Sequence, residues 1–204
     1  MAKDVVVIGA GGHAKVIADI VLCSGDNLVG FLDDNIKKGV NVFGEYEVLG
    51  RIADSAKFKD YWFIVAIGDN HLRANIVTGL NGFKWYTAIH PNAVISGAVK
   101  VGEGTAVMAG VVVNADSVIG KHCILNTSCS IDHDNELGDF VHISPGAHLA
   151  GTVSIGDYSW VCMGASIINN TVVAEDVVIG AGATVLNDLD EEGVYVGVPA
   201  KRIK

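Results

Sequence analysis

The sequence lacks several features that would place it in a special class of protein. Only 18% of its 204 residues are charged and half are apolar, a composition that argues against disorder and favours a well-buried globular protein. No run approaches the roughly 18 uninterrupted apolar residues of a membrane span. No apolar signal segment with a cleavage site precedes the first strand-like run, so we expect a cytoplasmic protein.

Cysteine is scarce, and its placement argues against the usual metal and redox motifs. The chain has four cysteines, and none of them forms a CxxC pair. Cys23 falls in a predicted helix, while Cys123 and Cys129 occupy positions that the repeat described below turns inward. We therefore interpret the cysteines as core thiols of a protein in a reducing compartment.

Basic residues are few in the second part of the chain. Residues 1–88 carry 9 Lys and Arg against 10 Asp and Glu, whereas residues 89–204 carry 5 against 13. This acidic balance disfavours nucleic-acid binding. An anionic cofactor stays compatible with it, because backbone amides and a few cations can hold phosphate groups. Lys201, Arg202 and Lys204 form the obvious basic cluster, which we interpret as a solvated tail.

A strict period of six runs through the second part of the chain. The residues two places before the repeated positions are small or β-branched, with Asn135 as the exception. This period is neither helical nor a simple alternation, and it predicts a left-handed parallel β-helix of hexapeptide repeats. The repeated positions are all aliphatic: Ile89, Ile95, Val101, Val107, Val113, Ile119, Leu125, Ile131, Leu137, Ile143, Leu149, Ile155, Val161, Ile167, Val173, Ile179 and Val185.

The repeat fixes which residues are neighbours in space. Three hexads make one triangular coil of about 18 residues, so residues that far apart stack in adjacent coils at a spacing of about 4.8 Å. Acyl transfer is the commonest use of this architecture, although it also allows a carbonic anhydrase or a plain scaffold. We assign residues 89–204 to this domain, including a C-terminal tail.

Residues 1–88 show the pattern of a small, Rossmann-like α/β domain. Residues 4–8 read as a buried parallel strand, followed by a glycine turn over residues 9–14 and a helix with apolar periodicity. The glycines let the backbone approach a phosphate closely, and the start of the helix offers unpaired N–H groups and a favourable dipole. Two further strands are predicted at residues 28–32 and 62–67.

Ligand-type residues follow the strands of this domain. Asp33 and Asp34 come after the second strand, about 20 residues beyond the GxGxxA pattern, where carboxylates can bind a ribose, and Gly68 comes after the third. We expect a nucleotide site rather than an NAD(P) dehydrogenase, because only half of a dinucleotide fold is present and no catalytic domain follows. His13, inside the glycine turn, fits either a helix-capping residue or a contact to phosphate or sugar.

The densest polar cluster of the repeat surrounds His133. This residue lies two places after inward-facing Ile131, so it should face outward, between Asp132 and Asp134. A carboxylate beside an imidazole orients the ring and favours its protonated form, as a general base requires. Gly151 stacks on His133 in the next coil, where it leaves room for a substrate and could offer its N–H to an oxyanion.

The other histidines are interpreted less specifically. His142 lies half a coil from His133, so the two could share a site only if different protomers supplied them. Zinc is the main rival use of histidines on this scaffold, as in γ-class carbonic anhydrases, but His122, His142 and His148 lack the ligand spacing of that family, and we predict no metal. We expect four histidines to be surface residues: His71, His90, His122 and His148.

These motifs together identify a family resemblance that runs from end to end of the chain. The sequence resembles the bacterial NeuD/PglD-type sugar acetyltransferases, which include perosamine and other aminodideoxysugar N-acetyltransferases. The matching segments are Ile8–Lys15, Phe31–Asp34, Ala66–Asn70, Ile89–Pro91, Ile124–Thr127, Ile131–Asp134, His142–Ser144 and Val196–Lys201.

The resemblance implies an assembly, two substrates and a set of site residues. It implies a homotrimer with active sites between adjacent β-helices, a nucleotide-linked sugar held by the N-terminal domain, and acetyl-CoA held by the β-helix. His133 resembles the general base, and Asp134 stands where a carboxylate sharpens that base. The implied substrate-binding residues are Gly11, Gly12, His13, Asp33, Asp34, Gly68 and Asn126. The implied acetyl-CoA contacts are His142, Gly151, Met163 and Ala181.

The sequence therefore predicts direct acetyl transfer to a sugar amine. His133 removes a proton from the amine of a nucleotide-linked 4-amino-4,6-dideoxy sugar, and the N–H of Gly151 stabilises the oxyanion. Sugar O-acetylation, as on sialic acid, and a non-catalytic nucleotide-sugar-binding scaffold are the alternatives. The sequence leaves open whether the nucleotide carries uridine, guanosine or thymidine.

Overall fold

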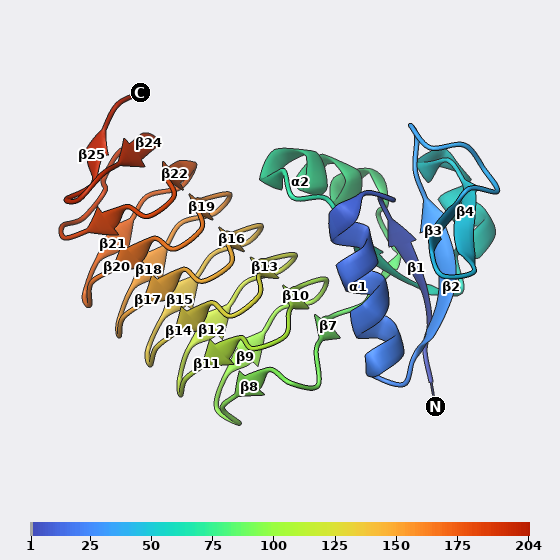
Figure 1. Ribbon diagram of the computed structural model, residues 1–204, viewed down its shortest axis with the longest axis horizontal. Helices are drawn as coiled ribbons and strands as arrows, with labels where there is room; N and C mark the ends of the chain where they lie inside the picture. The colour runs from blue at the N-terminus through green and yellow to red at the C-terminus, as the bar shows by residue number, and fades with distance from the viewer. Residues whose placement is uncertain (1) are drawn as a thin grey trace. The chain divides into compact units, whose positions relative to one another are not determined.

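The computed structural model describes residues 2–204 (Figure 1). The chain divides into two compact units, residues 1–91 and residues 92–204. Each unit has its own secondary structure and core. The first holds all the α-helices of the described chain, and the second is built from short strands joined by turns.

The first unit is a six-stranded sheet with helices packed against it. The strand order is β3-β4-β2-β1-β5-β6, parallel except for the edge strand β3. The strands are β1 (Asp4–Ile8), β2 (Asn27–Leu32), β3 (Asn41–Phe43), β4 (Tyr46–Gly50), β5 (Trp62–Val65) and β6 (Lys84–Trp85). The helices are α1 (Gly12–Cys23), the 3-10 helix η1 (Ile52–Phe58) and α2 (Asn70–Gly79), and a short strand β7 (Ala88–Ile89) ends the unit.

The apolar run of the first strand explains its place at the centre of this sheet. Val5, Val6, Val7 and Ile8 are fully buried, as expected for a parallel strand that is covered on both faces. α1 begins directly after the glycine turn and buries its apolar stripe. The predicted strand, glycine turn and helix are therefore confirmed at residues 4–23.

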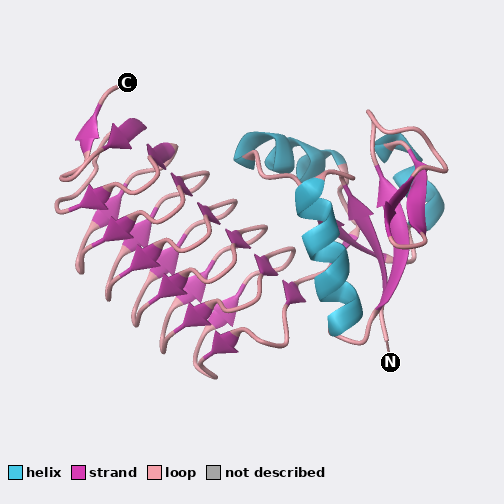
Figure 2. Ribbon diagram, in the orientation of Figure 1, coloured by secondary structure: helices cyan, strands magenta, loops and turns pink. Residues whose placement is uncertain are grey.

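The second unit is a β-helix of short strands, most of them two residues long, stacked into three sheets that are parallel except at β25 (Figure 2). The sheet that we call the first face holds β10 (Ala106–Val107), β13 (Ile124–Leu125), β16 (His142–Ile143), β19 (Trp160–Val161), β22 (Val177–Ile179), β24 (Gly193–Val196) and the antiparallel β25 (Lys201–Arg202). The second face holds β8 (Val94–Ile95), β11 (Val112–Val113), β14 (Ser130–Ile131), β17 (His148–Leu149), β20 (Ser166–Ile167) and β23 (Thr184–Val185). The third face holds β9 (Lys100–Val101), β12 (Val118–Ile119), β15 (Glu136–Leu137), β18 (Ser154–Ile155) and β21 (Val172–Val173).

The predicted register is confirmed strand by strand. Leu125 pairs with Ile143, Ile131 with Leu149 and Leu137 with Ile155, which is one coil of 18 residues in each case. From Val107 to Val185 every sixth residue is buried, and so is every residue two places before it. The first coil is less covered, since Ile95 and Val101 have only one neighbouring coil of the repeat and stay half-buried.

The corners of the coil take a backbone conformation that recurs with the same period. Every sixth residue from 104 to 182 has a positive φ, and most of these residues are not glycine, for example Asp116 (φ 61°), Asp134 (φ 57°) and Thr152 (φ 59°). A left-handed residue reverses the chain within two or three positions, so each hexad makes one short strand and one bend, as predicted.

Two sequence interpretations about buried side chains have different outcomes. Cys123 and Cys129 point into the core and are buried, which confirms them as core thiols. The same interpretation is wrong for Cys23, which is exposed at the C-terminal end of α1, and Cys162 is only half-buried. The interpretation of His122 as a surface residue is wrong. Only 4% of this side chain is exposed, and its ring stacks on Phe140 of the next coil with the ring centroids 5.3 Å apart.

Neither α-helix of the described residues is long and apolar enough to cross a membrane. The longer of the two, α1, has 12 residues.

The inward column should carry much of the stability of the β-helix. Ile155 is 2% exposed, so Ile155→Ala leaves a cavity and should lower the free energy of unfolding by about 2–5 kcal/mol. Val172→Ala, on the outward side of the same face, is the control and should cost less than about 1 kcal/mol, because Val172 is 52% exposed. Urea denaturation followed by circular dichroism measures both, and equal losses would contradict the inward column.

Candidate functional site

His133 is an outward-facing imidazole of the β-helix, at the corner between β14 and β15. Its Nδ1 lies 2.7 Å from Oδ2 of Asp134, and both side chains are more than half exposed. The hydrogen bond to Asp134, together with the charges of Asp132 and Asp134, raises the pKa of His133, and partial desolvation opposes this. The second ring nitrogen, Nε2, makes no hydrogen bond within residues 2–204, so it can take a proton from a ligand.

A second carboxylate holds the backbone of the same corner. Oδ1 of Asp132 accepts a hydrogen bond from the N–H of His133 at 2.9 Å and another from Nδ2 of Asn114, in the preceding coil, at 2.8 Å. These two bonds lower the pKa of Asp132, which therefore stays ionised beside the imidazole. His133 is thus flanked by two carboxylates with different tasks: Asp134 binds the ring and Asp132 binds the main chain.

Gly151 lies under the ring of His133, as the repeat predicts. A Cβ atom at residue 151 would stand 2.6 Å from Cε1 and 2.7 Å from Nε2 of His133, so any larger residue would displace the ring. The N–H of Gly151 makes no hydrogen bond within residues 2–204. An imidazole nitrogen and an unused backbone N–H therefore lie side by side, which is the pair that acyl transfer requires.

Asn126 and His142 form a separate pair on the first face. Nδ2 of Asn126 lies 3.3 Å from Nε2 of His142. The ring of His142 stacks on Trp160 with the centroids 5.5 Å apart, and only 7% of this histidine is exposed. His142 is held rigidly by these contacts, while the exposed part of Asn126 stays available to a ligand.

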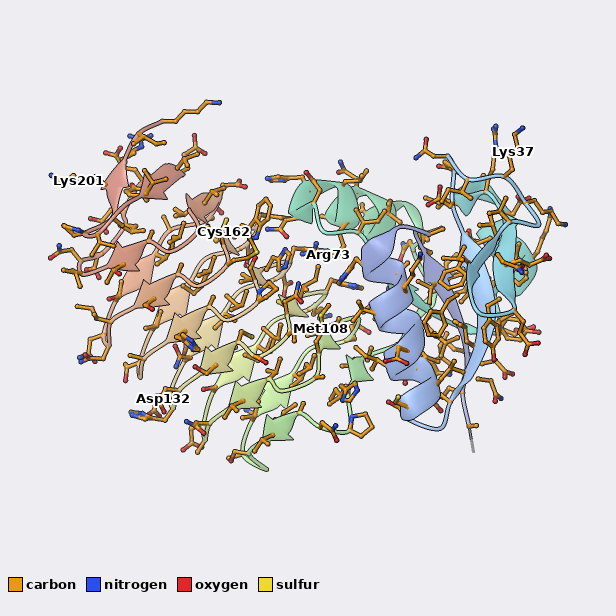
Figure 3. The ribbon with its side chains drawn as sticks, in the orientation of Figure 1. Lys37, Arg73, Met108, Asp132, Cys162 and Lys201 are labelled. Atoms are coloured by element: carbon orange, nitrogen blue, oxygen red, sulfur yellow. The ribbon has the colours of Figure 1, made fainter. Side chains whose placement is uncertain are left out.

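The two remaining predicted cofactor contacts lie on the corner that follows the first face. Met163 is 61% exposed and stacks under Ala181, the N–H of Gly182 donating to the carbonyl of Met163 at 2.8 Å. Figure 3 shows Asp132, the neighbour of His133, and Cys162, the neighbour of Met163, on different edges of the β-helix. Within one chain the predicted residues therefore form two groups on different edges of the coil.

Three glycines of the first unit have space beside them that the unit does not use. A Cβ atom at Gly11, Gly12 or Gly68 would meet no atom within 4 Å, and none of the three has a positive φ. Gly9 differs, since its φ is +99° and a Cβ atom there would stand 3.0 Å from the carbonyl oxygen of Ala66. Gly9 is needed for the turn, whereas Gly11, Gly12 and Gly68 leave the start of α1 and the end of β5 open to a ligand.

The two predicted aspartates of this unit differ in how they are used. Asp33 accepts hydrogen bonds from the N–H groups of Ala10, Asn35 and Ile36 at 2.8–2.9 Å, so it joins the glycine turn to the loop after β2. Asp34 accepts one, from the N–H of Ile52 at 3.0 Å. Asp34 thus keeps more of its carboxylate for a ligand than Asp33 does.

A cavity of about 480 Å3 opens beside Asp34 and is lined by three cations that we did not predict. They are Lys37, Lys38 and Arg51. The adjacent lysines, which begin three residues after Asp34, were a signal for such a cluster. Arg51 lies between β4 and η1, which no motif connects to β2. The lining combines these three cations with the carboxylates of Asp34 and Asp54, and the excess of positive charge suits a phosphorylated ligand.

The charge of Arg73, another residue that sequence reasoning missed, acts on His13. The Arg73 guanidinium donates to the carbonyls of Ile67 and Gly68, at 2.9 and 3.3 Å, and so fixes the loop after β5. Burial and the charge of Arg73 lower the pKa of His13 to about 4, so its ring is neutral at pH 7. Nε2 of His13 is buried without a hydrogen-bond partner in residues 2–204, and a neutral ring there can accept or donate one bond.

The histidines weighed for zinc do not come together. Of the described residues, the only group of three that could surround a metal ion is Asp19, Cys23 and His90, which includes none of His122, His142 and His148.

Comparison with known proteins supports the resemblance. Residues 4–80 match the PglD N-terminal domain. The UDP-N-acetylbacillosamine N-acetyltransferase of Bacillus subtilis is 35% identical over 112 residues, which cover 52% of this chain and 52% of that protein. The chain spans no more than about half the length of the first curated relatives that it matches, 24% and 52%.

Solved structures cover the whole chain. A histidine-to-alanine mutant of the GDP-perosamine N-acetyltransferase from Caulobacter crescentus, in complex with CoA and GDP-perosamine, has a TM-score of 0.94 and 38% identity over 98% of this chain and 97% of that one. The acetyltransferase domain of PglB from Neisseria gonorrhoeae, in complex with acetyl coenzyme A, has a TM-score of 0.93 and 37% identity over 100% of both chains. The matching N-terminal domain, the hexapeptide β-helix and this full-length similarity show that the chain belongs to the NeuD/PglD-type family of sugar acetyltransferases.

Proposed function

We propose that the chain is an acetyl-CoA-dependent N-acetyltransferase that acts on the amine of a nucleotide-linked 4-amino-4,6-dideoxy sugar. The observation that carries this proposal is the geometry at the corner of His133. The imidazole is hydrogen-bonded to Asp134, and its Cε1 and Nε2 atoms would lie only 2.6 and 2.7 Å from a Cβ atom added at residue 151, so the ring lies directly against Gly151. The similar Caulobacter structure, with CoA and GDP-perosamine bound, supports this substrate class.

The reaction proceeds by direct transfer. Nε2 of His133 accepts a proton from the sugar amine while the amine nitrogen attacks the thioester carbonyl carbon. The N–H of Gly151 stabilises the tetrahedral oxyanion, which collapses as the C–S bond breaks and CoA leaves as a thiolate. No cysteine acyl-enzyme is needed, and burial raises the pKa of Cys129 to about 12, so this thiol stays protonated.

The substrates occupy different parts of the chain in this proposal. The open space at Gly11, Gly12 and Gly68, with His13, Asp33 and Asp34, receives the nucleotide-linked sugar, and the cations beside Asp34 balance its phosphates. Asn126 contacts the sugar. His142, Gly151, Met163 and Ala181 contact acetyl-CoA. No metal takes part.

A homotrimer completes the site in this proposal. His133 and the group formed by His142 and Met163 lie on different edges of one β-helix, so a neighbouring chain brings one group against the other. We infer a cytoplasmic protein, and the free thiols of Cys23 and Cys162 fit a reducing compartment.

The proposal is tested by turnover and by a histidine variant. The purified protein is assayed for release of CoA from acetyl-CoA with UDP-, GDP- and dTDP-linked 4-amino-4,6-dideoxy sugars and with free sialic acid. We expect turnover with at least one amino sugar, and His133→Ala should lower kcat by at least about 100-fold because the base is lost.

His148→Ala is the matched control, since His148 is an exposed imidazole of the same β-helix and should leave kcat within about twofold. If the enzyme acetylates sialic acid and none of the amino sugars, the acceptor is a hydroxyl group and the proposed amine acceptor is wrong. A His133→Ala enzyme with the activity of the parent would refute the base assignment.

The carboxylate on the ring should set the pH dependence. Asp134 raises the pKa of His133, so Asp134→Asn should lower that pKa and move the acid limb of the pH profile of kcat/KM to lower pH. The maximum value of kcat/KM should also fall, because a histidine with a lower pKa is a weaker base. Asparagine tolerates the φ of +57° at this corner, so the fold should survive. Asp116→Asn changes the equivalent corner of the preceding coil and should leave the pH profile unchanged; a shift in both variants would argue against a specific Asp134 contact.

The open glycines should admit the nucleotide. Gly12→Val fills space that no atom of the first unit occupies, so the melting temperature should stay within about 2 °C while the Kd for the preferred nucleotide, measured by isothermal titration calorimetry, rises at least about tenfold. A thermal-shift screen with UDP, GDP and dTDP identifies that nucleotide first. Unchanged affinity in Gly12→Val would place the phosphates elsewhere.

A further inference from the structure

One inward position of the β-helix carries a polar amide where all the others carry small or β-branched residues. Asn135 is fully buried. The residue at the same place two coils earlier is Val99, and the one in the next coil is Val153. Valine fills this place without removing a polar group from water, whereas a buried amide destabilises the fold unless all its hydrogen bonds are made. The asparagine therefore needs a reason beyond packing.

The amide of Asn135 binds the backbone on both sides of the catalytic corner. Nδ2 donates to the carbonyls of Asp132 at 2.7 Å and His133 at 3.2 Å, within its own coil, and to the carbonyl of Ala150 at 3.0 Å in the next one. Oδ1 accepts from the N–H of Val153 at 3.2 Å. Ala150 directly precedes Gly151 and Val153 is two residues after it, so one side chain ties the His133 corner to the Gly151 corner.

A buried hydroxyl in the preceding coil continues this link. Oγ of Ser117, which stacks under Asn135, donates to the carbonyl of Asp132 at 2.7 Å and accepts from the N–H of Asn135 at 3.2 Å. The carbonyl of Asp132 thus receives hydrogen bonds from both inward residues. Together Ser117 and Asn135 hold the corner from the inside across three successive coils.

The same corner is also held from the outside. The carboxylate of Asp132 binds Asn114 of the preceding coil and the N–H of His133, as described above. The main chain that carries His133 is therefore bonded on its inner side by Asn135 and Ser117, and on its outer side by Asp132. The imidazole has little freedom left except rotation of its own side chain, which the bond to Asp134 restricts.

We propose that Asn135, together with Ser117, positions His133 over Gly151 for acetyl transfer. This inference rests on the proposed function. Both residues are positioning residues, since neither side chain faces the substrate. A base and an oxyanion donor must keep their relative place to within about 0.5 Å, and a displacement of about 1 Å can cost about 100-fold in rate. The amide is bonded to the main chain of both groups, so it sets the distance between them.

The test removes each inward polar group and compares it with an equivalent group elsewhere. The variants are Asn135→Val, which installs the residue found at positions 99 and 153, and Ser117→Ala. Ser159→Ala is the matched control, because the Ser159 hydroxyl is equally buried and makes the same kind of pair of bonds, to the carbonyl of Ala174 at 2.8 Å and from the N–H of Val177 at 3.1 Å.

Two readouts separate positioning from plain stability. Steady-state kinetics at 25 °C should give a kcat lower by about 10- to 100-fold in Asn135→Val and by a smaller factor in Ser117→Ala, with KM for both substrates within about twofold, while Ser159→Ala keeps its kcat. NMR titration of the His133 ring, assigned with His133→Asn, should show its pKa falling toward the ordinary value in Asn135→Val, because the bond to Asp134 loosens.

The outcomes decide the inference and the proposed function separately. If Asn135→Val and Ser117→Ala melt earlier but keep kcat and the His133 pKa, these residues only stabilise the fold and the inference is overturned. If Asn135→Val does not fold, Ser117→Ala decides on the same two readouts. If the parent protein turns over no amino sugar, the proposed function fails, and the NMR titration alone decides whether Asn135 fixes the ring.

Discussion

The stacking of each hexad on the hexad one coil later is the constraint on which the β-helix depends. Leu125 pairs with Ile143 and Ile131 with Leu149, and the same offset of 18 residues relates the paired strands from β8 to β23. The buried column from Val107 to Val185 enforces that offset, since a shift by one residue would turn the aliphatic side chains outward. A rigid coil of this kind can hold two groups on adjacent turns in one fixed relation.

The proposed reaction uses this property of the coil at one corner. His133 and Gly151 are consecutive members of one stack, so their approach needs no flexible loop. What distinguishes their corner from the others is polar: Asp134 binds the ring, Asp132 binds the main chain, and Asn135 bonds the carbonyl groups from within. A repeat that is otherwise almost uniform is thus specialised by a few hydrogen-bonding side chains, and the aliphatic column supplies the rigid support.

The first unit has a different role in the proposed function, the recognition of the nucleotide-linked sugar. Its glycines fall into two kinds: Gly9 serves the turn, and Gly11 and Gly12 leave open the start of α1. Asp33 organises the loop around this opening and Asp34 faces the cavity with its cations. In the proposed reaction the unit supplies binding energy and orientation, and the β-helix supplies the base and the oxyanion donor.

The sequence by itself determined the coil, its register, the inward and outward sides and the pairing of His133 with Gly151, because contacts in a repeat follow from counting residues. Only the tertiary structure decided that His122 is buried against Phe140, that Asn135 bonds three carbonyl groups, and that the charge of Arg73 lowers the pKa of His13. These contacts depend on how individual side chains and loops fill the space between elements. No period in the sequence encodes that filling, since it is set by packing and hydrogen-bond geometry at each place.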